Sequence, residues 1–174
     1  MDKLKILLDG VQGQCDWFGL RQYNEKNHTQ VSRNGEVANN HFGQDLGVMV
    51  EVLNNGQLAY SATSNLTPAG IQKAFDHALY LANVSATHKV TQFDESIRPI
   101  EEGTFKSSFK EDLGRLSPSE VQKRLIEVTS ILKNHKNIIE AQAWAMITQT
   151  EIDFISSNGS RLQQSFQIVT RDLS

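Results

Sequence analysis

The stretch SRNGEV, residues 32–37, decides how this sequence folds. Asn34-Gly35 is the strongest two-residue signal for a β-hairpin, because a type I′ turn needs positive φ at both central residues. The charged neighbours leave open a second interpretation, a charged active-site loop. Asn-Gly recurs at residues 55–56 and 158–159, which favours the turn. We therefore interpret the motif as structural first, comprising Arg33, Asn34, Gly35 and Glu36.

Around this turn the apolar residues alternate with a period of two. From Cys15 to Tyr60 the pattern predicts about five short strands in an antiparallel meander. The sequence DWFGLRQY places Phe18 and Leu20 on one face of a strand and Trp17 on the other. From residue 138 onward we expect a strand, a break near Gln149, a second strand and, after Asn158-Gly159, a third.

Two segments predict amphipathic helices. In residues 65–83, Thr67 is the expected N-cap and Pro68 occupies the first helical position. The apolar stripe of this helix is Ile71, Ala74, Phe75, Ala78, Leu79 and Ala82. In residues 116–134, Ser117 and Glu120 predict a capping box. The stripe expected to face the sheet here is Val121, Leu125, Val128 and Leu132. A weaker helical pattern in residues 1–10 indicates the end of a further helix.

The predicted fold class is α+β, with antiparallel β-meanders joined by tight Asn-Gly hairpins and two amphipathic helices packed on one face. Residues 87–115 have little periodicity, and we expect this long connection to wrap the surface or contact a neighbour. The sequence stops at Ser174 directly after a strand. Because edge strands are normally protected, we expect residues 1–174 to be a single lobe of a longer protein.

Composition narrows the function classes. The 174 residues carry a formal net charge of −3 with acidic and basic residues interspersed. Nucleic-acid binders usually have a basic face, so we expect no nucleic-acid partner. The single cysteine, Cys15, indicates a reducing compartment, and no apolar run of about 18 residues occurs. We expect a cytoplasmic protein with no membrane association.

Motifs that carry chemistry are scarce. The five histidines show no spacing typical of a zinc site, and neither a P-loop nor a nucleophile elbow occurs. Cys15 precedes Asp16 and has no basic neighbour that would stabilise a thiolate. We therefore expect no catalytic residue, no metal ligand and no cofactor in this chain.

The order of the motifs, however, resembles the N-terminal domain of the TldD/PmbA family, also labelled modulators of DNA gyrase. The matching pieces, which extend the resemblance over residues 15–174, are Arg33 to Glu36, Gly47 to Val50, Gly56, Tyr60 to Thr63, Leu66-Thr67 and ISSNGSRLQQ at residues 155–164.

The resemblance implies a zinc-dependent peptidase system acting on peptides or unfolded segments, often as an assembly of two subunit types. Its H-E-x-x-x-H metal motif belongs to the family's C-terminal domain. This motif is absent here, so the resemblance transfers no catalytic or metal residue, and zinc is expected only in the C-terminal domain of a catalytic parent protein.

We hypothesise that the lobe helps to bind or enclose an extended peptide and to form an interface with a homologous or identical TldD/PmbA-type subunit. A free sheet edge can bind peptide through main-chain hydrogen bonds. The alternative is a stand-alone protein-interaction module with no role in proteolysis.

Overall fold

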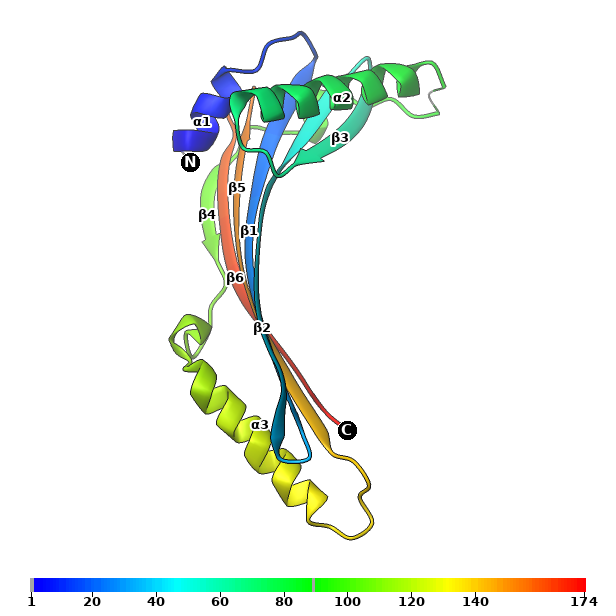
Figure 1. Ribbon diagram of the computed structural model, residues 1–174. Coiled ribbons are helices and arrows are strands. Elements are labelled where there is room, and N and C mark those ends of the chain that lie inside the picture. Colours follow the sequence, from blue (N-terminus) through cyan, green and yellow to red (C-terminus); the bar gives the residue numbers. More distant parts are fainter. Residues whose placement is uncertain (1, 89) are drawn as a thin grey trace. The chain divides into compact units, whose positions relative to one another are not determined.

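Six strands hydrogen-bond in the order β3-β2-β1-β5-β6-β4 in the computed structural model, which describes residues 2–88 and 90–174 (Figure 1). The strands are β1 (Trp17–Arg33), β2 (Glu36–Asn54), β3 (Gln57–Thr63), β4 (Glu102–Lys106), β5 (Gln142–Ser156) and β6 (Arg161–Leu173). The helices are α1 (Asp2–Asp9), α2 (Pro68–Ala86) and α3 (Pro118–Lys133), with short 3-10 turns η1 (Glu95–Ile97) and η2 (Leu113–Arg115). The α+β class is confirmed.

The first half of the sheet is a meander with tight reversals. Asn34 and Gly35 have φ values of 52° and 85°, and Asn55 and Gly56 have φ values of 51° and 74°. Positive φ at both central residues is the signature of a type I′ turn, as the sequence predicts. The expected five short strands are wrong, since β1 and β2 are single strands of 17 and 19 residues. Polar residues lie on both faces of these long strands, so the alternation of apolar and polar residues does not show that each strand is continuous.

The third Asn-Gly pair, Asn158-Gly159, does not form the same type I′ turn. Gly159 has a φ of 105°, but Asn158 does not adopt positive φ. Its side-chain amide instead donates to the carbonyl oxygen of Arg98 at 2.8 Å. The shared dipeptide therefore predicts a turn at all three places but the same turn type at only two.

The second half of the sheet also differs from the expectation. β5 runs unbroken from Gln142 to Ser156, so the predicted break near Gln149 is wrong. The long connection contains β4, which contacts β6 through Arg161 N to Glu101 O and Ser107 N to Ser165 O. From the first contact to the second the residue numbers rise in both strands, so β4 runs parallel to β6.

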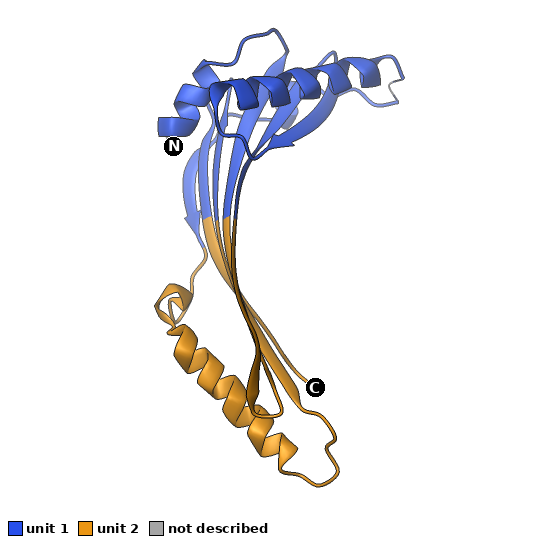
Figure 2. Cartoon of the chain, in the orientation of Figure 1, with its two compact units in different colours: residues 1–24, 45–106, 151–164 blue, residues 25–44, 107–150, 165–174 orange. Residues whose placement is uncertain are grey.

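The chain divides into two compact units, each described here by itself (Figure 2). Unit 1 comprises residues 1–24, 45–106 and 151–164, and unit 2 comprises residues 25–44, 107–150 and 165–174. Four strands, β1, β2, β5 and β6, contribute residues to both units.

Unit 1 has an apolar core beneath α1 and α2. The valines at 48, 50 and 52 of β2 alternate with residues of the opposite face, as a half-buried strand requires. Phe18 packs edge-on against Phe75, with ring centroids 5.2 Å apart, and Leu20 belongs to the same cluster, so these two residues share one face of β1 as predicted. The buried cluster is Leu4, Leu7, Leu8, Leu20, Val48, Val50, Val52, Ile71, Ala74, Phe75, Ala78 and Ile155.

Unit 2 is built differently, because polar side chains lie between α3 and the sheet. The fully buried Thr129 hydroxyl contacts Ser32 Oγ at 2.9 Å and accepts from Gly35 N at 3.1 Å. Gln30 donates to Pro118 O at 2.9 Å and to Gln122 Oε1 at 3.3 Å.

The predicted apolar stripe of α3 is wrong in phase. The buried residues of this helix are Gln122 and Thr129, while Val128 is exposed. The hydrogen-bond partners offered by β1 decide which face turns inward. The capping box is also not formed, since Ser117 makes no side-chain cap and its Oγ lies 2.7 Å from Ser119 Oγ.

Candidate functional site

The hairpin motif lies in unit 2, where its polar groups hold the turn in place. Asn34 N donates to Ala141 O at 2.8 Å, and Asn34 Oδ1 accepts from Ala141 N at 2.9 Å. Arg33 donates to Gln142 Oε1 at 3.0 Å. The carbonyl of Glu36 accepts from Ser32 Oγ at 2.8 Å. These contacts give the motif a structural role, and they leave the adjoining strand edge in solvent.

That strand edge is formed by residues 36–43 of β2, here called the β2 edge. The pairing of β2 with β3 starts only at Val48, opposite Thr63, which is the last residue of β3. Within the described sheet the neighbours of β2 are β1 and β3. The β2 edge therefore has β1 on one side and no strand on the other.

The β2 edge lacks two of the usual protections. Natural edges carry lysine, proline or bulges that prevent pairing with another chain. The sequence EVANNHFG contains neither lysine nor proline. Two apolar side chains on it are exposed, Val37 by 55% and Phe42 by 60%. This segment is open to pairing with an extended chain.

A second candidate lies in unit 1, on the sheet face opposite the apolar core. Glu51 of β2 has no solvent exposure and lies between two arginines. Arg98 Nη2 donates to Glu51 Oε2 at 3.1 Å. Arg21 Nη2 lies 2.7 Å from Glu51 Oε1, an ion pair outside hydrogen-bond geometry. A buried carboxylate requires such partners, because an unpaired buried charge costs several kcal/mol.

Aromatic rings orient both arginines. The guanidinium of Arg21 lies 5.3 Å from the ring centroid of Phe154, and that of Arg98 lies 5.6 Å from the ring centroid of Trp17. Gly19 makes this arrangement possible, because a Cβ atom there would lie 2.9 Å from the Phe154 ring. Cation–π contacts and the shared carboxylate thus fix both cationic groups.

Arg98 reaches the sheet from the loop before β4, and backbone contacts hold that loop independently. Ser160 Oγ donates to Pro99 O and accepts from Glu101 N, both at 3.1 Å. Asn158 Nδ2 donates to the carbonyl of Arg98, as described above. The turn between β5 and β6 therefore positions the loop that carries Arg98.

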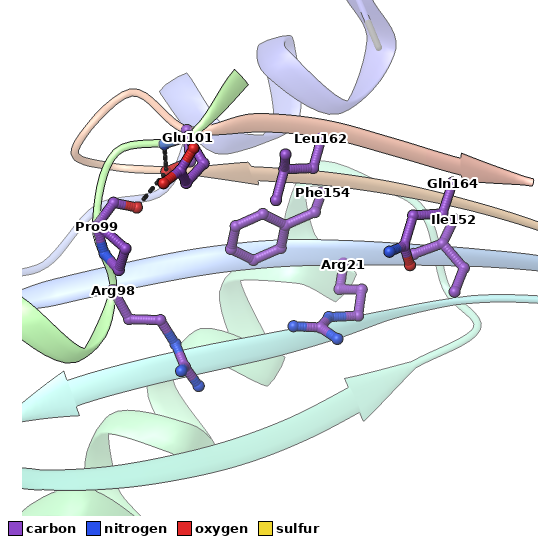
Figure 3. Close-up of a pocket in the computed structure, with 9 residues that line it drawn as sticks. Arg21, Arg98, Pro99, Glu101, Ile152, Phe154, Leu162 and Gln164 are labelled. Carbon is purple, nitrogen blue, oxygen red and sulfur yellow. Dashed lines mark hydrogen bonds between the residues drawn. The ribbon is translucent and has the colours of Figure 1, made fainter. Parts of the chain in front are cut away.

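Beside the two arginines lies a pocket of about 330 Å³, here called the arginine pocket. Figure 3 shows the guanidinium groups of Arg21 and Arg98 close together, on the same side of the Phe154 ring. The pocket is lined by Arg21, Arg98, Pro99, Glu101, Ile152, Phe154, Ser160, Leu162 and Gln164.

The arginine pocket was not foreseen from the sequence. Its one sequence signal is Glu51, a carboxylate inside the otherwise apolar run GVMVEVL, where period-two burial demands a cationic partner. The partners are distant in sequence, so the pattern does not identify them.

The described residues do not form a metal centre. Among residues 2–88 and 90–174, no three side chains of His, Cys, Asp or Glu converge on a common point. Burial, helped by the neighbouring carboxylate of Asp16, raises the pKa of Cys15 to about 11. Cys15 is therefore a neutral thiol at physiological pH, neither a nucleophile nor a soft metal ligand. In the same described part of the chain, no helix is long and apolar enough to cross a membrane.

Residues 21–82 match the family model described as PmbA/TldA metallopeptidase domain 1. This match supports an N-terminal domain of the TldD/PmbA family over these residues. The matched residues include the Arg33–Glu36 hairpin, the β2 edge, Glu51 and most of α2. The resemblance stated from the sequence is thus confirmed. No curated protein matches the chain.

Solved structures share the fold of this TldD/PmbA domain over nearly its whole length. A Bacteroides thetaiotaomicron protein provisionally described as a modulator of DNA gyrase has a TM-score of 0.70 at 16% identity, covering 99% of this chain and 40% of its own. TldE from Thermococcus kodakarensis has a TM-score of 0.63 at 13% identity, covering 99% and 42%. A Thermotoga maritima protein with a description like the first has a TM-score of 0.65 at 16% identity, covering 99% and 37%. The chain therefore spans about two fifths of the length of these relatives.

Proposed function

We propose that this chain is the non-catalytic lobe of a TldD/PmbA-like metallopeptidase system and that it binds extended peptide at the β2 edge. The observation that carries the proposal is an unprotected strand edge next to the hairpin in a domain of a metallopeptidase family. A peptide that pairs with this edge is recognised mainly by its backbone. Such recognition depends little on side chains and suits a peptidase that acts on unfolded segments.

The hairpin geometry identifies the groups that would contact the peptide. In a two-residue hairpin the residues flanking the turn, Arg33 and Glu36, pair with each other. Along an antiparallel strand the backbone N–H groups point alternately to either side. The N–H group of Val37, the residue after this pair, therefore points away from β1 and is available to a peptide.

The outer surface of α3 supports a second part of the proposal, a subunit interface. Ile131 is 71% exposed and Val128 is also exposed, although both lie on a helix whose inner face is satisfied by polar contacts. The two residues are three positions apart and so lie on one face of the helix, where exposed apolar side chains together can form an association surface. The partner in this proposal is another TldD/PmbA-type subunit.

Hydrolysis is assigned to a different part of the system. The residues described here do not fit a zinc ion, since they bring no three ligands together and Cys15 is protonated. In the family resembled, zinc belongs to the C-terminal domain of the catalytic subunit. Within this proposal the lobe supplies binding and positioning, and no chemical step is assigned to it.

Peptide binding is tested at Val37, whose backbone N–H points outward next to the turn. Val37→Pro removes this donor without removing a donor to β1, and Val37→Ala is the matched control that keeps it. With a labelled, uncharged eight-residue peptide, fluorescence anisotropy should show binding weakened about two- to tenfold by proline, the net value of one hydrogen bond. Alanine should leave the affinity unchanged. Equal affinities for all three proteins would refute binding at this edge.

The alternative, a stand-alone interaction module, predicts a different selectivity. Such a module would bind one folded partner and ignore unstructured peptides. Binding of several unrelated extended peptides, each weakened by Val37→Pro, supports the peptidase lobe. If the chain binds none of these peptides, the module is favoured and the peptide proposal fails.

A further inference from the structure

We propose that the arginine pocket is a binding site for a monocarboxylate that carries an apolar group. All its residues belong to unit 1, whereas the β2 edge belongs to unit 2. The inference is therefore independent of the proposed function, and different variants test the two.

The two arginines beside Glu51 indicate an anionic ligand. Glu51 neutralises one arginine, but two guanidinium groups contact it, at 2.7 Å and 3.1 Å. Glu51 therefore balances one of the two positive charges beside it, and Glu101 is a further carboxylate residue in the pocket lining. Arg21 and Arg98 keep side-chain exposures of 34% and 29%, so an entering anion can reach both. Guanidinium groups are suited to carboxylates because they donate two parallel hydrogen bonds.

Buried N–H donors without an acceptor also indicate a ligand. The Nε atoms of Arg21 and Arg98 are buried without a hydrogen-bond partner, and so is Nε1 of Trp17. Buried polar atoms almost always have partners, and an orphan donor costs about 1–3 kcal/mol. Arg21 and Arg98 line the pocket, whereas Trp17 does not, and unpaired donors on the two lining arginines are the arrangement expected of a site whose acceptor arrives with the ligand.

The walls define the rest of the ligand. Pro99, Ile152, Phe154 and Leu162 line the pocket with apolar surface. A volume of about 330 Å³ lies at the lower end of the range for small-molecule sites. One apolar side chain or short acyl chain with its carboxylate matches this size.

Glu101 sets a limit on ligand charge. Among the residues that line the pocket, Glu101 is the one with a carboxylate, and its backbone N–H is already bound to Ser160. A second negative charge on the ligand would face repulsion from Glu101. The pocket should therefore prefer monocarboxylates to dicarboxylates of similar size.

A purely structural role for Arg98 explains less. The loop that carries it is already held by backbone contacts of Asn158, Ser160 and Arg161. Its side chain is not required to fasten the loop, although it donates the hydrogen bond to Glu51 that Arg21 does not make. This role accounts for Nη2 of Arg98 but leaves the Nε atoms of both arginines without an acceptor.

The test uses N-acetyl-phenylalanine and its neutral amide as probes, with calorimetry on the 174-residue chain. Arg98→Gln should weaken binding of the acid about tenfold, and Arg161→Gln, an exposed arginine outside the pocket, is the matched control for charge. Leu162→Trp fills the pocket without changing charge and should also abolish binding. This variant keeps the proposal testable if Arg98→Gln does not fold.

Selective binding of the acid over the amide and over N-acetyl-aspartate, lost in Arg98→Gln or Leu162→Trp but kept in Arg161→Gln, supports the inference. Equal binding of acid and amide, absence of binding to the unaltered chain, or equal loss in Arg161→Gln overturns it. Comparing Gly-Gly-Gly-Phe with N-acetyl-phenylalanine then shows whether the carboxylate belongs to the C-terminal residue of a peptide or to a free acid. Tighter binding of the peptide identifies a C-terminal residue, and equal or weaker binding identifies a free acid.

Discussion

At the residue scale, Gly35 joins the hairpin to α3. Its φ is 85°, a conformation that side chains with a Cβ atom rarely adopt, and a Cβ atom there would lie 2.5 Å from Ser130 Oγ. Backbone strain and close approach thus both require glycine at this position. Its N–H also donates to Thr129, so any shift of the turn disturbs the buried hydroxyl contacts of unit 2.

Gly35→Ala should therefore destabilise the chain by about 2 kcal/mol or more, from strain plus overpacking. Urea denaturation measures the change. Combining it with Ser130→Ala removes the clashing oxygen and should recover part of the loss, leaving the strain. If the double variant is no more stable than Gly35→Ala alone, the contact with α3 is not responsible.

Cys15 gives a prediction for reactivity and pH. Its thiol pKa is raised from 9.0 to about 11, first by burial and second by Asp16. Because two pKa units correspond to a hundredfold lower thiolate fraction, alkylation at pH 8 should be about 100-fold slower than in the urea-unfolded chain. A similar rate in both states would contradict the raised pKa.

The same shift fixes the sign of the pH dependence. The folded state holds the proton more tightly than the unfolded state, so this stabilisation is complete below pH 9 and is lost as the pH rises toward 11. Cys15→Ser should flatten that part of the stability profile. A decline of the same size in the serine variant would assign the effect to other groups.

Residues whose role is local could be predicted from the sequence, and those with distant partners could not. Left-handed φ at Asn34 and Asn55 depends on the dipeptide itself. Asn158 departs from the rule because its amide binds a carbonyl 60 residues away. Likewise, Glu51 signals a buried charge, but nothing in its neighbourhood in the sequence names Arg21 or Arg98 as partners.

At the scale of elements, packing partners decide what the helix signals leave open. For α2 the predicted stripe and the cap agree with the structure, because its face meets an apolar sheet and Thr67 accepts from Gly70 N at 3.2 Å. For α3 the apolar stripe misleads, since β1 presents Gln30 and Ser32 to it. The same sequence rules therefore succeed or fail according to the surface opposite the helix.

The two helix starts provide a matched pair of variants. Thr67→Ala removes a working N-cap and should cost about 1 kcal/mol of stability, whereas Ser117→Ala removes none and should cost a few tenths at most. Equilibrium urea unfolding of both variants measures the difference. Equal costs would mean that Ser117 caps α3 in solution, as the sequence alone predicts.

At the scale of the whole molecule, the long strands contribute to two cores of different chemistry. Unit 1 buries a continuous apolar cluster that includes Phe75 and Leu20. In unit 2 the buried residues of α3, Gln122 and Thr129, make hydroxyl and amide contacts, which contribute less net free energy than apolar burial. Secondary structure alone does not reveal this contrast, since it arises from which residues face the helices.

The contrast predicts different local stabilities along one strand. In β5, residues 152–155 lie in unit 1 and residues 143–148 lie in unit 2. Native-state hydrogen exchange should show greater protection for the first group, because its opening exposes the apolar cluster. Phe75→Ala, which truncates a fully buried ring, should lower the protection of residues 152–155 by up to about 3–5 kcal/mol. Residues 143–148 should change much less, since their exchange is governed by opening of the polar core. Uniform protection along β5, or an equal loss in both groups, would show that the two cores unfold together.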